Sequence, residues 1–400
     1  MVLLRVALFI LALLGLPDWY LYSAFVKGRG LSRRRTCLLW LPRTCLLWLP
    51  SVLLLLALGV FIVMGRTYHE AFGFYLIIAF AVCIPKAIFV VLHLLLRGIG
   101  LVGIRNRLHR AVYNKVSTAM CSLIAVAALA SIVFGATVGK HLFRVREVTY
   151  TSDELPSAFN GYRIVQISDI HTGSWNNDTT AMRRAVELCN GLQADAVAFT
   201  GDLVNSESNE LKPYMRILSQ LTAKDGVFSI LGNHDYALYS HWNSEAERLA
   251  DVDSLIAHEG SMGWQMLIND HRIIRRGNDS IAIVGVENSG RPPFPDRADL
   301  PKALKGTDGM FKVLLSHDPT HWRRSVLPDT DIALTLSGHT HDMQIKVFGF
   351  SPSVFVYPEY DGMYTEGKRA LFVNIGLGYV LFPMRIGAWP EITVITLKKQ

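Results

Sequence analysis

Four long apolar runs near the start of the chain constrain its fold more than any other feature of the sequence. A helix needs about 20 mostly apolar residues to cross the hydrocarbon core of a bilayer. Runs of that kind cover residues 6–26, 45–64, 71–96 and 117–138. We therefore expect an all-α region of four transmembrane helices over residues 1–143, followed by a linker over residues 144–160.

The first apolar run has the position of a secretory signal peptide but lacks its other marks. Arg5 is the single charged residue before it, and the stretch Leu16-Pro17-Asp18-Trp19 offers no cleavage site between small residues. A signal peptide needs both a basic start and such a site. We therefore expect the first run to be retained as a membrane span.

Basic residues are concentrated in two of the loops between the runs. Six of them lie within residues 27–43 and five within residues 97–115, whereas the loop between the second and third runs has Arg66 alone. Basic loops stay on the cytoplasmic side of a membrane. We therefore expect the N-terminus and the chain after about Lys140 to lie on the outer face of a cytoplasmic membrane.

Composition disfavours two other kinds of function. Residues 1–143 carry 15 basic and two acidic side chains, whereas residues 144–400 carry 25 and 31. The basic charge thus flanks apolar runs and does not form a soluble nucleic-acid surface. We therefore expect membrane lipids as partners and no nucleic acid. The chain has no Cys-x-x-Cys pair, and Cys189 is the only cysteine after residue 143, which disfavours a zinc ribbon or a redox site.

Three residues with charged or imidazole side chains lie within the apolar runs: Asp18, Lys86 and His93. Ionisable residues at membrane depth are functional candidates by default. All three, however, lie near the ends of runs or near prolines, where their side chains can reach the membrane surface. We favour this second interpretation.

From Tyr162 onward, short apolar runs predict strands. The expected strands cover residues 162–168, 195–200, 227–231, 281–286, 311–316, 332–337, 370–375 and 391–397, with helices at 179–192 and 213–224. Strands alternate with helices early in this region and follow one another later. This order indicates an α/β sandwich built around two sheets over residues 161–400.

Five of the expected strands are followed directly by polar residues that can bind metals. These residues are Asp169 and His171; Asp202; Asn233, His234 and Asp235; His317; and His339 and His341. Ligand sites in open α/β sheets gather at the carboxyl ends of strands. In Asp-x-His and His-x-His, residues two apart in an extended segment point the same way, so both can reach one site.

This set of side chains suits a pair of metal ions. Two ions about 3.5–4 Å apart can clamp a phosphoryl group and activate a water molecule, and they need carboxylate, imidazole and amide ligands. Any one of these residues alone would be weak evidence, because Gly-Asp and Gly-Asn-His-Asp are also ordinary turn sequences. All five segments together predict a binuclear site.

The motifs Asp169-x-His171, Gly201-Asp202, Gly232-Asn233-His234-Asp235, His317 and Gly338-His339-x-His341 together resemble the signature of the calcineurin-like metallophosphoesterase superfamily. The resemblance covers residues 160–400 and is closest to the bacterial membrane-associated branch. It implies a metallophosphoesterase-type β-sandwich flanked by helices. One departure is Asp342-Met343-Gln344, where many relatives have Gly-Gly-Gln. Since every ligand position is kept, the departure bears on the substrate and not on the chemistry.

The resemblance also implies a role for each residue. Asp169, His171 and His341 would hold one metal, Asn233, His317 and His339 would hold the other, and Asp202 would bridge the two. His234 would protonate the leaving oxygen or stabilise the charge that builds on the phosphate, and Asp235 would orient its ring. The expected metals are two divalent or trivalent ions of manganese, iron or zinc, and the expected reaction is in-line attack by a metal-bridging hydroxide.

Two further residues are candidates for substrate binding. Arg385 could grip a phosphate with two parallel hydrogen bonds, although a packing role is equally open. Asn205 could hydrogen-bond a ligand, although a role within its loop is also open.

We therefore expect an integral protein of the bacterial cytoplasmic membrane that hydrolyses a phosphodiester or pyrophosphate bond. Tethering raises the local concentration of partners in the membrane, so a lipid-linked or envelope substrate is the expected class. The alternative is a membrane receptor or transport component that binds a phosphate ligand without turnover. An intact His234 disfavours that alternative, because a binder has no need of a general acid. A metal-stabilised scaffold is a third reading, and the mixed ligand set disfavours it.

Overall fold

The computed structural model describes residues 14–27, 33–64 and 69–400. The chain divides into two compact units. The membrane unit comprises Met1–Thr137 with Leu381–Met384, and the sandwich unit comprises Val138–Val380 with Arg385–Gln400.

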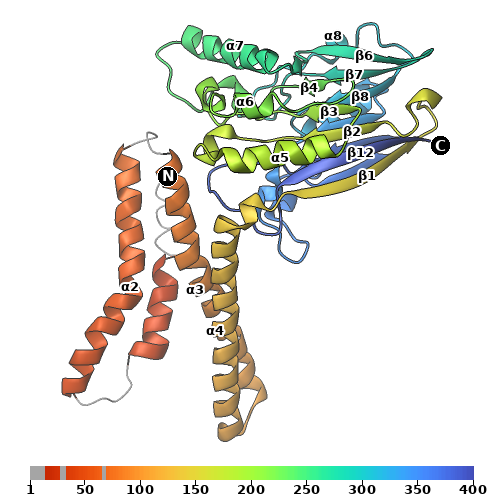
Figure 1. Ribbon diagram of the computed structural model, residues 1–400. Helices are drawn as coiled ribbons and strands as arrows, with labels where there is room; N and C mark the ends of the chain where they lie inside the picture. Colours follow the sequence, from red (N-terminus) through yellow and green to blue (C-terminus); the bar gives the residue numbers. More distant parts are fainter. Residues whose placement is uncertain (1–13, 28–32, 65–68) are drawn as a thin grey trace. The chain divides into compact units, whose positions relative to one another are not determined.

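The membrane unit is built from long helices (Figure 1). Among its helices are η1 (Tyr22–Val26), which continues a helical stretch at 14–21, and α2 (Arg33–Met64), α3 (His69–Gly103) and α4 (Arg107–Thr137). Within the described residues, three helical stretches are long and apolar enough to cross a membrane: Thr44–Phe61, Ala71–Gly103 and Arg107–His141. The second, third and fourth expected spans are therefore present. The first, at 6–26, lies partly outside the described residues, so it stays a prediction.

The polar residues of the spans pair with one another inside the membrane unit. Asp18 is fully buried and accepts hydrogen bonds from Ser51 Oγ at 2.5 Å and Lys86 Nζ at 2.7 Å. His93 lies 2.9 Å from the Tyr20 hydroxyl through Nδ1. The interpretation that these groups reach the membrane surface is wrong for Asp18 and His93, because both are buried and their partners come from other helices.

Near its start, the sandwich unit has a strand where a linker was expected. β1 (Arg144–Ser152) pairs in parallel with β12 over its whole length, from Arg144 opposite Glu391 to Ser152 opposite Lys399. Its side chains are largely exposed and include Arg146 and Glu147. An edge strand of this kind lacks the buried apolar run that marks the inner strands, so the linker prediction at 144–160 was wrong.

Two six-stranded sheets form the centre of the unit. One has the order β1-β12-β2-β3-β4-β5 and the other the order β10-β11-β9-β8-β7-β6, and each mixes parallel and antiparallel pairs. The remaining strands are β2 (Arg163–Ile167), β3 (Ala196–Phe199), β4 (Val227–Ser229), β5 (Gln265–Met266), β6 (Asp270–Arg276), β7 (Asp279–Gly285), β8 (Phe311–Leu315), β9 (Leu334–Ser337), β10 (Gly362–Glu366), β11 (Arg369–Val373) and β12 (Glu391–Lys399).

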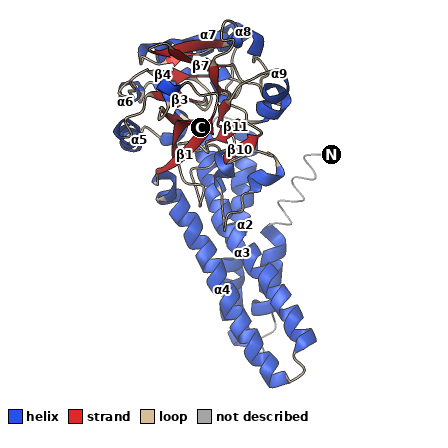
Figure 2. Cartoon of the chain, turned by 90° about the vertical axis from the view of Figure 1, so that its right-hand side faces the viewer, coloured by secondary structure: helices blue, strands red, loops and turns tan. Residues whose placement is uncertain are grey.

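Three apolar cores separate four layers. One core joins the two sheets, and each outer core joins a sheet to its helices. The first sheet is covered by α5 (Thr179–Gly191), α6 (Met215–Leu218) and α7 (Glu245–Ser261), and the second by α8 (Leu300–Leu304), η8 (Trp322–Val326) and α9 (Leu327–Asp329). Figure 2 shows α5 and α6 on one side of the strands and α9 on the other. The expected α/β sandwich is present.

All eight expected strands and the helix at 179–192 are present, but two helical segments differ from expectation. The helix expected at 213–224 shortens to α6 with turns around it, whereas α7 was not anticipated. Ser244 caps α7 by accepting from the Glu247 amide at 3.1 Å, and Glu247 accepts from the Asn243 amide at 2.9 Å. Ser-x-x-Glu before a helix is a start signal that the sequence carries.

Candidate metal centre

The carboxyl ends of five strands meet at one site. β2, β3 and β4 of the first sheet end just before Asp169, Asp202 and Asn233, and β8 and β9 of the second end just before His317 and His339. The arrangement brings together three groups of possible ligands, each with its ligating atoms within 4.8 Å of one another: Asp169, His171 and His341; His171, Asp202 and His234; and Asp202, His317 and His339.

The first group converges on a single point. His171 Nε2 lies 3.1 Å from His341 Nε2, and His341 Nε2 lies 3.3 Å from Asp169 Oδ1. All three side chains are buried. Two imidazole nitrogens and a carboxylate at this spacing are a suitable set of ligands for one divalent ion.

Asp202 lies between the first group and a second one, which is formed by Asp202, His317 and His339. Asp202 Oδ2 lies 3.1 Å from His317 Nε2 and 3.7 Å from His171 Nε2. His317 Nδ1 lies 2.7 Å from the Thr200 carbonyl, so this nitrogen donates and Nε2 is free to face a metal. A carboxylate between two sets of imidazoles is the arrangement that a bridging ligand requires.

An unsatisfied amide oxygen provides a test of whether metals fit. Asn233 Nδ2 donates to the Tyr239 hydroxyl at 3.0 Å, which fixes the amide, and Asn233 Oδ1 is buried without a donor among the described residues. A buried acceptor left unpaired is costly. A cation beside Oδ1 would satisfy it, so the residues present fit the second metal.

The backbone at the site is strained. Asp169, His171, Asp202, His339 and His341 all adopt left-handed conformations, with φ between 50° and 76°. Such a conformation costs a residue with a β-carbon of the order of 1–3 kcal/mol and is concentrated at functional sites. The fold therefore holds these five side chains in place against a local preference.

Two glycines are required by the close approach of the loops. A β-carbon on Gly232 would collide with Asp202 Oδ1, and one on Gly338 would collide with Asp169 Oδ2. Both motifs thus place glycine where a carboxylate passes over the backbone.

Three of the candidate ligands carry the charge that metal ligation requires, whereas His317 must lose a proton: burial lowers the pKa of its ring, but Asp202 raises it more, to about 10. Burial lowers the pKa of His171 to about 3 and that of His339 to about 4, so both rings are neutral. Burial raises the pKa of Asp202, but His317, His234 and His171 lower it more, so Asp202 is a carboxylate. Neutral imidazoles and an ionised carboxylate are the ligand forms that metals bind.

His234 is held by Asn205 and not by Asp235. His234 Nδ1 lies 2.7 Å from the Asn205 carbonyl, and the ring stacks on Tyr239 with centroids 4.3 Å apart. Asp235 instead accepts backbone N–H groups, among them those of Asp202 and Gly232, each at 2.8 Å. The expectation that Asp235 orients the His234 ring was wrong, because its carboxylate is used to fix the two loops.

Arg385 does not face a substrate. It is fully buried, and it donates to the carbonyls of Gly378 at 2.7 Å, Ile375 at 2.8 Å and Ala388 at 2.9 Å, while Nη2 lies 3.2 Å from His341 Nδ1. Every one of these partners belongs to the protein. These contacts favour the packing role that the sequence left open, in which Arg385 supports the segment behind His341; the phosphate contact stays a prediction.

Asn205 contributes its backbone to the site, and its side chain binds within the protein. Its Nδ2 donates to Ser174 Oγ at 2.7 Å, and its amide donates to Glu210 Oε2 at 2.5 Å. Burial raises the pKa of Glu210 to about 7. Glu210 thus fixes the carbonyl that holds His234, a role that nothing in its sequence position indicates.

Tyr357 also supports the site. Its hydroxyl lies 3.0 Å from His339 Nε2, which leaves His339 Nδ1, 3.3 Å from His317 Nε2, as the nitrogen that faces the second group. Tyr357 follows the last motif by sixteen residues, and the contact depends on the course of the loop between them.

Asp342-Met343-Gln344, which stands in place of Gly-Gly-Gln, keeps a backbone conformation that glycine favours. Asp342, Met343 and Gln344 all have left-handed backbones, with φ of 50°, 45° and 61°. Glycine adopts this conformation freely, and other residues adopt it at a cost. The loop therefore follows the course that two glycines would favour.

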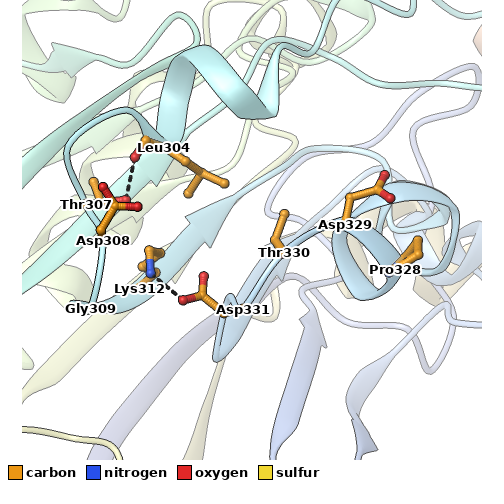
Figure 3. Close-up of a pocket in the computed structure, with 9 residues that line it drawn as sticks. All are labelled: Leu304, Thr307, Asp308, Gly309, Lys312, Pro328, Asp329, Thr330 and Asp331. Carbon is orange, nitrogen blue, oxygen red and sulfur yellow. Dashed lines mark hydrogen bonds and ion pairs between the residues drawn. The ribbon is translucent and has the colours of Figure 1, made fainter.

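A hollow lies at the edge of the second sheet that is opposite the candidate metal centre. It has a volume of about 450 Å³ and opens where β8 and β9 begin (Figure 3). Lys312 Nζ lies 2.9 Å from Asp331 Oδ2 within it. None of its lining residues is a candidate ligand. They are Leu304, Thr307, Asp308, Gly309, Lys312, Pro328, Asp329, Thr330 and Asp331.

Comparison with known proteins agrees with the geometry. The family model described as calcineurin-like phosphoesterase matches residues 162–343. A metallophosphoesterase of Bacillus subtilis, YkuE, is 30% identical over 270 residues, which cover 64% of this chain and 86% of that protein. A zebrafish "transmembrane protein with metallophosphoesterase domain" is 33% identical over 288 residues, which cover 70% of this chain and 62% of the longer zebrafish protein.

Among solved structures, a dimetal phosphatase from Danio rerio is 14% identical with a TM-score of 0.34, over 55% of this chain and 88% of that one. A likeness that slight adds nothing to the assignment. The family match and the bacterial relative define the class: the chain belongs to the calcineurin-like metallophosphoesterases. Three helices in the described part of the chain are long and apolar enough to cross a membrane, so it is a membrane protein of that family.

Proposed function

We propose that this protein is a membrane-anchored phosphoesterase that hydrolyses a phosphodiester or pyrophosphate bond with two metal ions. The single observation that carries the proposal is the position of Asp202, whose carboxylate faces His317 on one side and His171 on the other. Manganese, iron or zinc would suit the mixed ligands.

The two ions, when bound, supply a polarised phosphoryl oxygen and a nucleophile at neutral pH. Asp169, His171 and His341 would hold one ion, Asn233, His317 and His339 the other, and Asp202 both. Phosphoryl transfer depends chiefly on positioning and charge stabilisation, and the strained backbone of these ligands supplies the positioning.

His234 is the proposed general acid. Its Nδ1–H donates to the Asn205 carbonyl, which leaves Nε2 for the substrate. His234 can therefore hold a proton at Nε2 and deliver it to the leaving oxygen.

The proposed substrate class is lipid-linked. Its basis is the membrane unit, which keeps the sandwich unit beside a bilayer and so raises the local concentration of membrane substrates. The proposed location of the site is the outer face of the membrane, on the basis of the basic loops at 27–43 and 97–115.

The direct test is hydrolysis by the full chain in detergent, with a chromogenic phosphodiester and the matching monoester as probes. We expect turnover of the diester that falls about 10²–10⁴-fold in His234→Ala while the metal content stays unchanged. Turnover that survives in His234→Ala would refute the acid role. Bound metal without turnover of the diester, the monoester or a long-chain alkyl diester would favour the phosphate receptor.

A further inference from the structure

A segment of the sandwich unit displays apolar side chains that nothing in that unit covers. Ten large apolar residues are exposed among the described residues of the unit, and six of them lie within residues 347–356. They are Val347, Phe348, Phe350, Val354, Phe355 and Val356. The exposed fraction is 105% for Phe348 and 80% for Phe355, whereas none of the other four exceeds 44%. We call residues 347–356 the apolar loop.

The apolar loop has a defined conformation. The Val347 and Phe350 amides each donate to the other's carbonyl, at 2.9 and 3.0 Å, and the Phe350 and Phe355 rings lie 5.8 Å apart. The turn between them places Phe348 at φ 51° and Gly349 at φ 81°. A two-residue turn of this type favours Asn or Gly at its first position.

Phe348 is therefore doubly unfavourable in water. Its backbone adopts a left-handed conformation that a bulky residue avoids, and its ring has no cover. Backbone outliers that persist point to function, and a contiguous exposed apolar patch points to a binding surface. The loop contains no charged residue from Val347 to Val356.

The occupant that fits is the bilayer itself. The sandwich unit begins at Val138, the residue after α4 ends at Thr137, and α4 is one of the apolar helices long enough to cross a membrane. A folded unit of roughly 260 residues has a radius of gyration of about 18 Å. The tether thus keeps every point on its surface within roughly 50 Å of the membrane, and the bilayer is an apolar phase that the tether holds near the loop.

A second copy of the chain fits less well. A stable dimer interface buries about 800 Å² on each partner and uses roughly 20–30 residues a side. The apolar loop has ten residues and no exposed apolar neighbour of comparable size in the unit. Phenylalanine and valine side chains at the tips of turns instead suit the boundary between headgroups and acyl chains.

The apolar loop is also joined to the metal centre. Ser351 Oγ donates to the Asp342 carbonyl at 2.8 Å, and the Tyr357 amide donates to the Ser353 carbonyl at 2.9 Å. Tyr357 in turn contacts His339 at 3.0 Å. Displacement of the loop therefore acts on the side chain that supports a candidate ligand.

We propose that residues 347–356 insert into the lipid surface of the membrane in which the chain is anchored, and so present the metal centre to phosphate groups at that surface. Binding of the loop to lipid does not depend on the proposed function. The presentation of phosphate groups rests on the proposed function and narrows its substrate class to molecules that remain in the bilayer.

The first test measures the environment of the loop without turnover. The full chain, with its five native cysteines replaced by alanine, carries an environment-sensitive dye on Phe348→Cys in lipid nanodiscs. The control is Asp308→Cys, which is exposed at the opposite edge of the second sheet. We expect a blue-shifted emission that spin-labelled lipids quench at residue 348 and an unquenched, water-like emission at residue 308.

Two outcomes would overturn the proposal. One is a water-like emission at residue 348 that spin-labelled lipids leave unchanged. The other is a shift that persists in detergent and grows with protein concentration, which would assign the loop to a second copy of the chain.

The second test measures turnover with two probes, a water-soluble nitrophenyl diester and 4-nitrophenyl hexadecyl phosphate embedded in the nanodisc. We expect Phe348→Asp combined with Phe355→Asp to lower the rate on the embedded probe about tenfold or more, the factor for one lost aromatic contact. The rate on the soluble probe stays unchanged. If the variant and the wild type hydrolyse the embedded probe at equal rates, the loop does not present substrates. If the wild type hydrolyses neither probe, the result counts against the proposed function alone.

Discussion

Replacement of Arg385 distinguishes a buried support from a phosphate grip. Arg385→Met keeps most of the aliphatic volume and removes every donor. Three buried carbonyls, those of Gly378, Ile375 and Ala388, then lose their partner. A buried acceptor left unsatisfied costs about 1–3 kcal/mol, so we expect the three together to lower the free energy of unfolding of the sandwich unit by at least about 3 kcal/mol.

A loss of that size is readily measured. For a unit of this length, each kcal/mol lowers the unfolding temperature by about 2–4 °C, so Arg385→Met should unfold roughly 10 °C below the wild type. The assay is thermal unfolding of the metal-saturated full chain in detergent, followed by near-ultraviolet circular dichroism. Arg385→Lys is the matched control, because it keeps the charge but cannot span the three carbonyls as a planar fork. The unfolding temperature of Arg385→Lys should lie between those of the wild type and Arg385→Met.

The opposite pattern would refute the reasoning. If Arg385 gripped the substrate phosphate, Arg385→Met would raise KM for the diester and leave the unfolding temperature unchanged. An unfolding temperature within about 2 °C of the wild type, less than 1 kcal/mol, would show that the three carbonyls do not depend on Arg385.

Three further predictions follow from the site. Asp202→Asn should lower both metal content and diester turnover, measured together by elemental analysis and a nitrophenyl assay; full metal content would contradict the bridging role. Tyr357→Phe should weaken metal binding about 10-fold or more, the effect of losing a partner behind a ligand, and a metal titration with unchanged affinity would count against it. Burial raises the pKa of Glu210 from 4.5 to about 7. The contribution of Glu210 to the free energy of unfolding, at most about 3 kcal/mol, is therefore fully present below pH 4.5 and is lost as the pH rises through 7. Glu210→Gln should remove that loss, so the unfolding temperatures of variant and wild type should diverge between pH 5 and 8; parallel curves would refute it.

The candidate ligands could be predicted from the sequence because each directly follows a buried strand. β2, β3, β4, β8 and β9 are short apolar runs, and a run of that kind fixes where its carboxyl end lies. The parallel pairing of β2 with β3 and of β3 with β4 then brings Asp169, Asp202 and Asn233 to one edge. No knowledge of side-chain contacts was needed.

The roles of the supporting residues could not be predicted in the same way. Asn205 takes the role expected of Asp235, because the contact to His234 comes from a backbone carbonyl, which any residue at position 205 could provide. Arg385 lies among carbonyls whose positions depend on the course of residues 375–388. Contacts of this kind depend on loop conformation, and several of these loops use left-handed residues that the sequence does not mark with glycine.

Exposed elements were missed for a different reason. β1 is half polar because only one of its faces is covered, and its partner β12 lies about 240 residues further along the chain. An edge strand at that separation has no local pattern that distinguishes it from a linker. The apolar loop is likewise a short run without periodicity, and only its exposure marks it as unusual.

The central claim is that two metal ions share Asp202, and the magnetic coupling between them tests it most directly. Electron paramagnetic resonance of the manganese-loaded full chain, with bound manganese counted, reports whether the ions interact. The account predicts two ions per chain with the spectrum of a coupled pair, which Asp202→Asn converts to that of isolated ions or removes. A single ion per chain, or two ions whose spectrum shows no coupling in the wild type, would contradict it.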